Sequence, residues 1–483
     1  MSNTISQSTG FQSNGRKVSN AAIVAAIACV LISAILVFAI DSNNNLIFTV
    51  TGFMCFAVML LPIAVNKNYD LLSCWSLTCL SVFLGCFLRG IYIGIDYPDT
   101  VTLDFLFTLG VPTEEFYTPA VILVLSLFCC AVGYIFGPAK YKLNRRASYS
   151  SLSTKRIYVF AFITLCISLI CTVAFVSLTD GFDWQNISRK RTTIASLNLD
   201  GSHRTYGFLR NIASIAILAH LLVLADAIRS SQKKKAKYLL AFSLLIVASF
   251  LPFYASSRST IFTYLIMSMS VFYFCNKRVQ WFKIISMLLI AILIFQGMSV
   301  LRSSKELTFF DAITEQPINL SIIDMLILNR NGLELGKTAH IINAIPRTLD
   351  LQYGKTIAVW AVAIIPREIW NSKPLISAGP IIGSTLYGNR VSGVPPGLVG
   401  DLYWNFHIPG IILGGFFLGW LLKWADRRFK PRQEDPISVL VIYIYGPFNL
   451  GFLAAGGGLG GGIFNVAVST TIAILMFRFV RVR

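Results

Sequence analysis

The sequence predicts an all-α polytopic membrane protein with about twelve transmembrane helices, both termini in the cytoplasm and one large extracytoplasmic loop. Three observations predict this fold class. Hydrophobic residues make up 55% of the 483 residues and charged residues only 13%, and the mean hydropathy is +0.68. The apolar residues form runs long enough to cross a bilayer as helices. Basic residues collect in alternate loops between these runs.

The first span follows a polar stretch that ends with Arg16 and Lys17 before the apolar run. That run is too long for the core of a signal peptide, so we expect it to be retained with the amino terminus inside. The predicted spans cover residues 21–40, 46–65, 71–90, 119–137, 157–178, 207–227, 238–256, 260–275, 284–300, 409–422, 437–454 and 463–476. We interpret residues 1–483 as a single transmembrane domain.

The distribution of charge supports this alternation. Most of the 41 lysines and arginines fall in the tails and short loops assigned to the cytoplasm, as the positive-inside rule requires. These cations face the anionic cytoplasmic leaflet, and they account for most of the net charge of +19 without any nucleic-acid partner.

The large loop covers residues 301–408. Within it, the apolar run from Ile357 to Ile365 ends at Pro366. A helix of that length rises about 14 Å, roughly half of the hydrocarbon core. Proline lacks an N–H and disfavours helical angles in the residue before it, so Arg367 should emerge just after a break. We expect a short helix that lies at the membrane surface or re-enters the membrane.

Several arginines depart from the positive-inside trend. Arg89, Arg210, Arg258 and Arg302 lie at predicted outer ends of spans. Arginine donates two parallel hydrogen bonds to phosphate oxygens, and ionisable groups at such a depth commonly mark a substrate path. Ion pairs with the acidic residues of the outer loops, or contacts with outer-leaflet headgroups, are the alternatives.

Other sequence patterns limit the chemistry and the packing. The ten cysteines all fall within apolar runs, and the four histidines lack zinc-site spacing. Nucleotide-binding and hydrolase motifs are missing. We therefore expect no metal and no cofactor. Gly410, Gly414, Gly415 and Gly419 place small residues four apart in one span, which predicts tight helix packing.

The segment from Pro366 to Pro374 resembles the PR-x-x-W-x-x-KP element of bacterial oligosaccharide repeat-unit polymerases, the Wzy-type O-antigen polymerases. The run from Pro395 to Phe406 is similar to the sequence that follows this element in the family, and the resemblance is sharpest over residues 326–420. Asn371 departs from the family pattern, in which a proline is more usual.

The resemblance implies a glycosyltransferase of the C-type superfamily in the bacterial inner membrane, with its active site on the periplasmic side. Such an enzyme transfers the growing glycan from polyprenyl diphosphate to the non-reducing end of a new polyprenyl-diphosphate-linked repeat unit. Its partners are these lipid-linked oligosaccharides and membrane lipid. Binding of a chain-length-determinant protein stays open.

The residues fit that chemistry. Cationic side chains can stabilise a diphosphate leaving group without a metal. A single attack assisted by a general base inverts the configuration at the anomeric carbon. The candidates for holding the diphosphates are Arg258, Arg302, Arg330, Arg367 and Lys373. The candidates for packing on a sugar are Trp370 and Tyr403; for Trp370 and Trp404 the interfacial aromatic belt is an equal alternative. The candidates for the general base, among which the sequence does not choose, are Glu368, Asp401 and His340.

Two other functions use a similar layout. An O-antigen ligase would share the spans, the outer loop and the arginine-bound polyprenyl diphosphate. A lipid-linked oligosaccharide flippase would belong to another class and should carry charge in a mid-span cavity with broken helices in paired positions. Here the charge collects at the outer mouth and in one long loop, which argues against the flippase and leaves the ligase as the nearest alternative.

Overall fold

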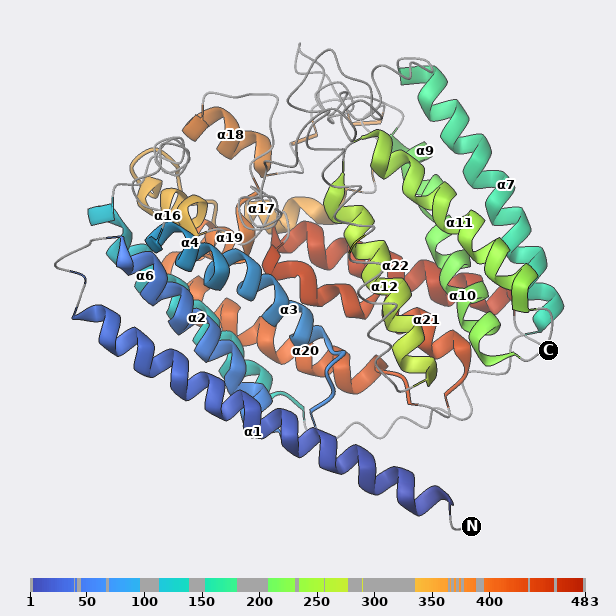
Figure 1. Cartoon of the computed structure of the whole chain (residues 1–483). Coiled ribbons are helices and arrows are strands. Elements are labelled where there is room, and N and C mark those ends of the chain that lie inside the picture. The colour runs from blue at the N-terminus through green and yellow to red at the C-terminus, as the bar shows by residue number, and fades with distance from the viewer. Residues whose placement is uncertain are drawn as a thin grey trace, which may run out of the picture. The chain divides into compact units, whose positions relative to one another are not determined.

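The computed structural model describes residues 3–38, 40, 45–66, 69–95, 113–138, 153–179, 207–230, 234–255, 257–276, 289, 335–363, 365, 369–370, 373–374, 378–387, 395–432, 435–455 and 458–480. Every regular element in these ranges is a helix (Figure 1). The chain divides into two units, which are described separately below.

The first unit combines the amino-terminal helices with most of the segment before the last spans. Its longer helices are α1 (Asn3–Val37), α2 (Leu46–Val65), α3 (Cys74–Val82), α4 (Arg89–Ile95), α6 (Tyr117–Phe136), α16 (Leu335–Ala344), α18 (Gly379–Tyr387), α19 (Gly397–Pro409), α20 (Gly415–Phe429) and the start of α22 (Leu459–Val480). Its shorter pieces are the π-helices η2 (Phe83–Leu88) and η7 (Gly410–Gly414), the 3-10 helices η3 (Thr113–Phe116), η6 (Val359–Val362) and η8 (Pro447–Ala455), and the single turn α17 (Lys355–Ala358).

Glycines allow the closest helix contacts in this unit. The backbone of α20 lies against α6 at Gly415 and Gly419, where a Cβ atom would meet the carbonyl oxygens of Ser126 and Cys130. Gly133 of α6 approaches α20 in the same way. Because no side chain separates the helices, their backbones meet directly. The predicted tight packing is confirmed for these positions.

The second unit is organised around α10 (Ala216–Arg229). It also contains α7 (Thr154–Thr179), α9 (Gly207–Ala213), α11 (Lys234–Tyr254), α12 (Arg258–Asn276), α21 (Ile437–Tyr445) and the end of α22. Residues 216–227 of α10 are all buried, because this helix is surrounded by α7, α11, α12 and α21. A helix that is buried on all sides is a central helix of its bundle.

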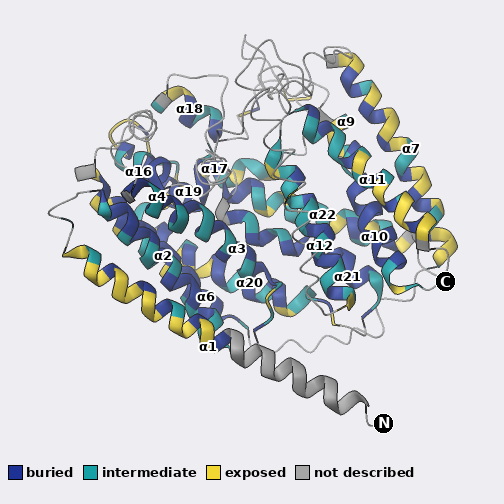
Figure 2. Ribbon diagram, viewed as in Figure 1, coloured by how far each residue is buried: buried dark blue, intermediate teal, exposed yellow. Residues whose placement is uncertain are grey.

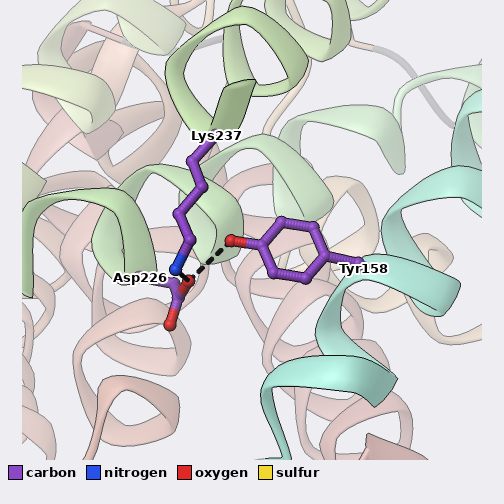
Figure 3. Close-up of polar contacts among 3 residues, drawn as sticks. All are labelled: Tyr158, Asp226 and Lys237. Atoms are coloured by element: carbon purple, nitrogen blue, oxygen red, sulfur yellow. Dashed lines mark hydrogen bonds and ion pairs between the residues drawn. The ribbon is translucent and has the colours of Figure 1, made fainter. Parts of the chain in front are cut away.

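Polar groups within the second unit find partners inside it. His220 of α10 bonds to the carbonyl oxygen of Ala241 through Nδ1 (2.7 Å) and to the hydroxyl of Ser268 through Nε2 (2.9 Å). At the end of α10, Asp226 Oδ2 accepts hydrogen bonds from Lys237 Nζ and Tyr158 Oη, both at 2.7 Å (Figure 3). Three helices, α7, α10 and α11, are therefore tied together at one buried carboxylate.

Ten described helices are long and apolar enough to cross a membrane, and each overlaps a predicted span. The stretch Ile437–Leu453 is apolar but shorter. The predicted span at 284–300 lies outside the described residues, except for residue 289. Apolar side chains are exposed along α1 and α7, as in helices that face lipid (Figure 2). The chain is a multi-pass membrane protein whose described regular structure is all helical, and the count of twelve spans and their orientation stay predictions.

One candidate span is bent. The helical stretch from Gly397 to Phe429 has 33 residues, but His407 within it has φ 54° and ψ −142°, far from helical values. The chain turns so sharply there that Gly414 lies against the side chain of Leu402. The predicted end of the large loop at residue 408 falls at this bend.

Candidate functional site

The structure describes some of the predicted site residues and not others. Arg302, Arg330, Arg367 and Glu368 lie outside the described residues. Arg258 begins α12 in the second unit and is partly buried. The remaining predicted residues lie in the first unit: His340, Trp370, Lys373, Asp401 and Tyr403.

The predicted short helix is present. Helix α17 and the 3-10 helix η6 together cover residues 355–362, so the helix begins and ends slightly earlier than the apolar run suggested. Trp360 packs against Gly460 and Gly461 at the start of α22, and its ring lies 5.7 Å from that of Phe464. Those glycines leave room for the indole. Helix α22 begins at Leu459, before the predicted start of the last span.

Lys373 closes the end of this short helix. Its Nζ donates to the carbonyl oxygens of Ala363 (3.0 Å) and Ile365 (2.7 Å), and the side chain is buried. The last carbonyls of a helix have no partner within it and carry partial negative charge, so an ammonium group stabilises them. The lysine charge is thus used to hold the backbone just before Pro366.

Asp401 joins three elements. Its Oδ1 accepts hydrogen bonds from Thr356 Oγ1 and Asn405 Nδ2, both at 2.9 Å, and its Oδ2 accepts one from Leu459 N at 2.7 Å. The residue is 2% exposed. Leu459 is the first residue of α22, where free N–H groups and the helix dipole favour a carboxylate. Asp401 therefore fixes α17 and α19 to the start of α22.

Trp404 anchors the turn before α17. The indole is fully buried, and its Nε1 donates to the carbonyl oxygen of Asp350 at 2.9 Å. The backbone carbonyl oxygen of Trp404 accepts a hydrogen bond from Gln352 N at 3.0 Å. The interfacial-belt interpretation is wrong for Trp404, because a belt residue keeps one face toward the membrane surface. Trp370, in contrast, is exposed.

Tyr403 and His407 form a pair at the bend after α19. Tyr403 Oη lies 2.7 Å from His407 Nε2, and the ring centroids are 4.4 Å apart. Since the residues are four apart on one helix face, their side chains meet even though the backbone of His407 is not helical. Tyr403 is buried, at 6% exposed, and His407 is partly exposed, so the imidazole is the more accessible member of the pair.

His340 lies near a carboxylate. Asn343, one turn later on α16, donates from Nδ2 to the carbonyl oxygen of Glu115 (3.0 Å) and to its Oε2 (3.5 Å). Burial lowers the pKa of His340 below its ordinary value, and the charge of Glu115 partly offsets this effect. An imidazole with a lowered pKa is neutral at neutral pH, as a general base must be.

Four residues of this site were not among the sequence-based predictions: Thr356, Asn405, His407 and Glu115. The spacing of four between Asp401 and Asn405, and again between Tyr403 and His407, is the signal that could have found two of them, because such residues share a helix face. The contacts with Thr356 and Glu115 join distant parts of the chain and have no local signal.

The chain matches no protein-family model, and neither a curated protein nor a solved structure is significantly similar to it.

Proposed function

We propose that this protein is a surface-polysaccharide polymerase: a metal-independent, inverting glycosyltransferase of the bacterial inner membrane, with its active site on the periplasmic side. It transfers the growing glycan from polyprenyl diphosphate to the non-reducing end of a lipid-linked repeat unit. The resemblance of residues 366–374 and 395–406 to the Wzy-type element suggests this activity.

The observation that carries the proposal is that the segment between two predicted spans is folded into short helices and fixed in place. Residues 335–409 include helices that do not span a membrane by length: α16, α17, α18 and the bent α19. Buried hydrogen bonds of Asp401 hold α17 and α19 to the start of α22, and the packing of Trp360 holds η6 there. Preorganised loops on a rigid support suit transfer chemistry, which requires reactants held in place.

The geometry supports a choice among the three base candidates. The carboxylate of Asp401 is buried, and its two oxygens already accept three hydrogen bonds from the protein, so we assign Asp401 the role of positioning residue. Glu368 lies outside the described residues. His340, partly buried beside Glu115, is the base in our proposal, and Glu115 is the carboxylate that stabilises its protonated form.

In the proposed reaction, the acceptor hydroxyl oxygen attacks the anomeric carbon of the donor sugar. The bond from that carbon to the diphosphate oxygen breaks, and its electron pair leaves with polyprenyl diphosphate. His340 takes the hydroxyl proton. We propose that the diphosphate charge is stabilised by arginines, because one guanidinium group donates two parallel hydrogen bonds to phosphate oxygens. These arginines are Arg258, Arg302, Arg330 and Arg367. Lys373 is proposed to act by holding the backbone before Arg367 in place.

The experiment is a gene deletion followed by gel analysis of the surface glycan. Loss of a polymerase leaves lipid anchors capped with a single repeat unit. Loss of a ligase leaves uncapped anchors with polymer retained on its carrier, and loss of a flippase leaves neither polymer nor an intermediate on the outer face. Complementation with His340→Gln should fail to restore polymer, whereas His203→Gln, a histidine of another predicted outer loop, should restore it. Full polymer with His340→Gln at normal expression would refute the base assignment.

A further inference from the structure

Two backbone outliers point to a second part of the site. In the ranges that the structure describes, two residues other than glycine have a positive φ: Tyr353 at 47° and His407 at 54°. Such conformations are costly for residues with a Cβ atom, and they concentrate at functional sites when the surrounding structure holds them. Glycine would serve better at both positions if only the backbone mattered.

The two outliers lie on segments that run side by side. Gln352 N donates to the carbonyl oxygen of Trp404 at 3.0 Å, which joins the turn before α17 to the end of α19. Phe406 lies against Gly354, where a Cβ atom would be 3.0 Å from the tip of the Phe406 ring. Tyr353 therefore precedes, and His407 follows, residues that touch each other.

Aromatic side chains are exposed at this junction. Tyr353 is 74% exposed and Phe406 is 45% exposed, although both belong to segments anchored by the buried Trp404. The neighbouring side chains of Arg347, Asp350 and Lys355 are also exposed, so the aromatic rings stand among charged groups. Lipid-facing surfaces exclude charges, which argues for water and a polar ligand here.

We infer that Tyr353 and Phe406, with the partly exposed imidazole of His407, form a carbohydrate-binding surface that receives a sugar ring of the lipid-linked oligosaccharide. A sugar offers an apolar C–H face, which packs on aromatic rings, and hydroxyl groups, which bond to the imidazole. The rigid turn holds Tyr353 before the ligand arrives, so little conformational freedom is lost on binding. This inference rests on the proposed function for the identity of the glycan.

The test uses the full chain in lipid nanodiscs and, as probe, the oligosaccharide released by mild acid from the cell's own lipid carrier. Titration with saturation-transfer NMR should give a Kd that rises about fivefold for Tyr353→Ala and for Phe406→Ala. Tyr353→Phe keeps the ring and should stay within about twofold of wild type, whereas Tyr353→Leu, which keeps the apolar bulk, should behave like Tyr353→Ala. Phe38→Ala, which removes an exposed aromatic at the end of α1, should leave Kd unchanged.

Wild-type binding that is undetectable at millimolar oligosaccharide, or a Kd unchanged in Tyr353→Leu, would overturn the inference. Thermal unfolding of each variant shows whether a weak binder is folded, and Tyr353→Phe serves as the folded reference. A failure of this binding test can be distinguished from a failure of the proposed function. If deletion leaves polymer intact, the polymerase assignment fails while the titration still judges the surface. If polymer depends on the protein but the aromatic variants bind normally, only the surface assignment fails.

Discussion

Removing the carboxylate of Asp401 is predicted to destabilise the first unit strongly. In Asp401→Ala, Leu459 N and Thr356 Oγ1 lose their acceptor, while Asn405 keeps the carbonyl oxygen of residue 401. Each buried donor left without a partner costs about 1–3 kcal/mol, so we expect a loss of about 4 kcal/mol. In Asp401→Asn, Asn405 can turn its partnerless Oδ1 toward the new amide, and the loss should be about 2 kcal/mol.

The assay is thermal unfolding followed with a thiol-reactive fluorophore. All ten cysteines are thiols, and seven of them are buried, so unfolding exposes them to the fluorophore. At about 2 °C per kcal/mol, Asp401→Ala should lower Tm by about 8 °C and Asp401→Asn by about half as much. The matched control is Asp350→Ala, which removes an exposed carboxylate from the same segment. A Tm for Asp401→Ala within about 1 °C of wild type would refute the assignment of Asp401 as a positioning residue.

Three further predictions concern other parts of the first unit. Gly419→Ala should lower Tm by several degrees, because the added methyl meets the backbone oxygen of Cys130, which cannot move aside; an unchanged Tm would contradict the close packing of α20 on α6. His407→Gly should be more stable than His407→Ala by about 1 kcal/mol, since both lose the side chain but only glycine relieves the positive φ, and the difference in Tm measures this. For polymerisation by membranes, the acid limb of the pH–rate profile should lie below the ordinary pKa of histidine, because the base must be neutral and burial lowers the pKa of His340; Glu115→Gln removes the charge that raises this pKa and should move the acid limb to lower pH, and a shift to higher pH would contradict the assignment.

The spans could be predicted from the sequence because the bilayer imposes a length and a polarity on each one. The positions of α2 and α6 follow directly from their apolar runs. The glycines of α20 also gave a correct prediction, since a spacing of four puts them on one helix face. These signals are local, so a single sequence contains them.

The site could be predicted less completely because its geometry depends on contacts between distant residues. Asp401 was recognised as chemically important, but its use at the start of α22 depends on Leu459 N, far along the chain. Lys373 was expected to bind diphosphate, yet its ammonium group bonds to carbonyl oxygens at the end of the short helix. A lysine in a phosphate site and a lysine at a helix end look alike in sequence.

Two buried aspartates, one in each unit, each accept a hydrogen bond from a tyrosine hydroxyl. Asp426 accepts from Tyr134 Oη (2.8 Å) and from Cys74 N (2.9 Å) at the start of α3. Asp226 likewise accepts from Tyr158 Oη, but its other donor is the ammonium group of Lys237. In Figure 3 the lysine and the tyrosine converge on the same carboxylate oxygen.

Removing the carboxylate charge of Asp226 should be strongly destabilising. Asp226→Asn leaves a buried ammonium group without a counter-charge, at about 3–5 kcal/mol. The double variant Asp226→Asn with Lys237→Met should recover stability relative to Asp226→Asn, because it removes the unpaired charge. Thermal unfolding of the wild type, Asp226→Asn, Lys237→Met and the double variant gives the coupling energy. A loss below about 1 kcal/mol for Asp226→Asn, together with no recovery in the double variant, would mean that Lys237 reaches water and that the ion pair contributes little.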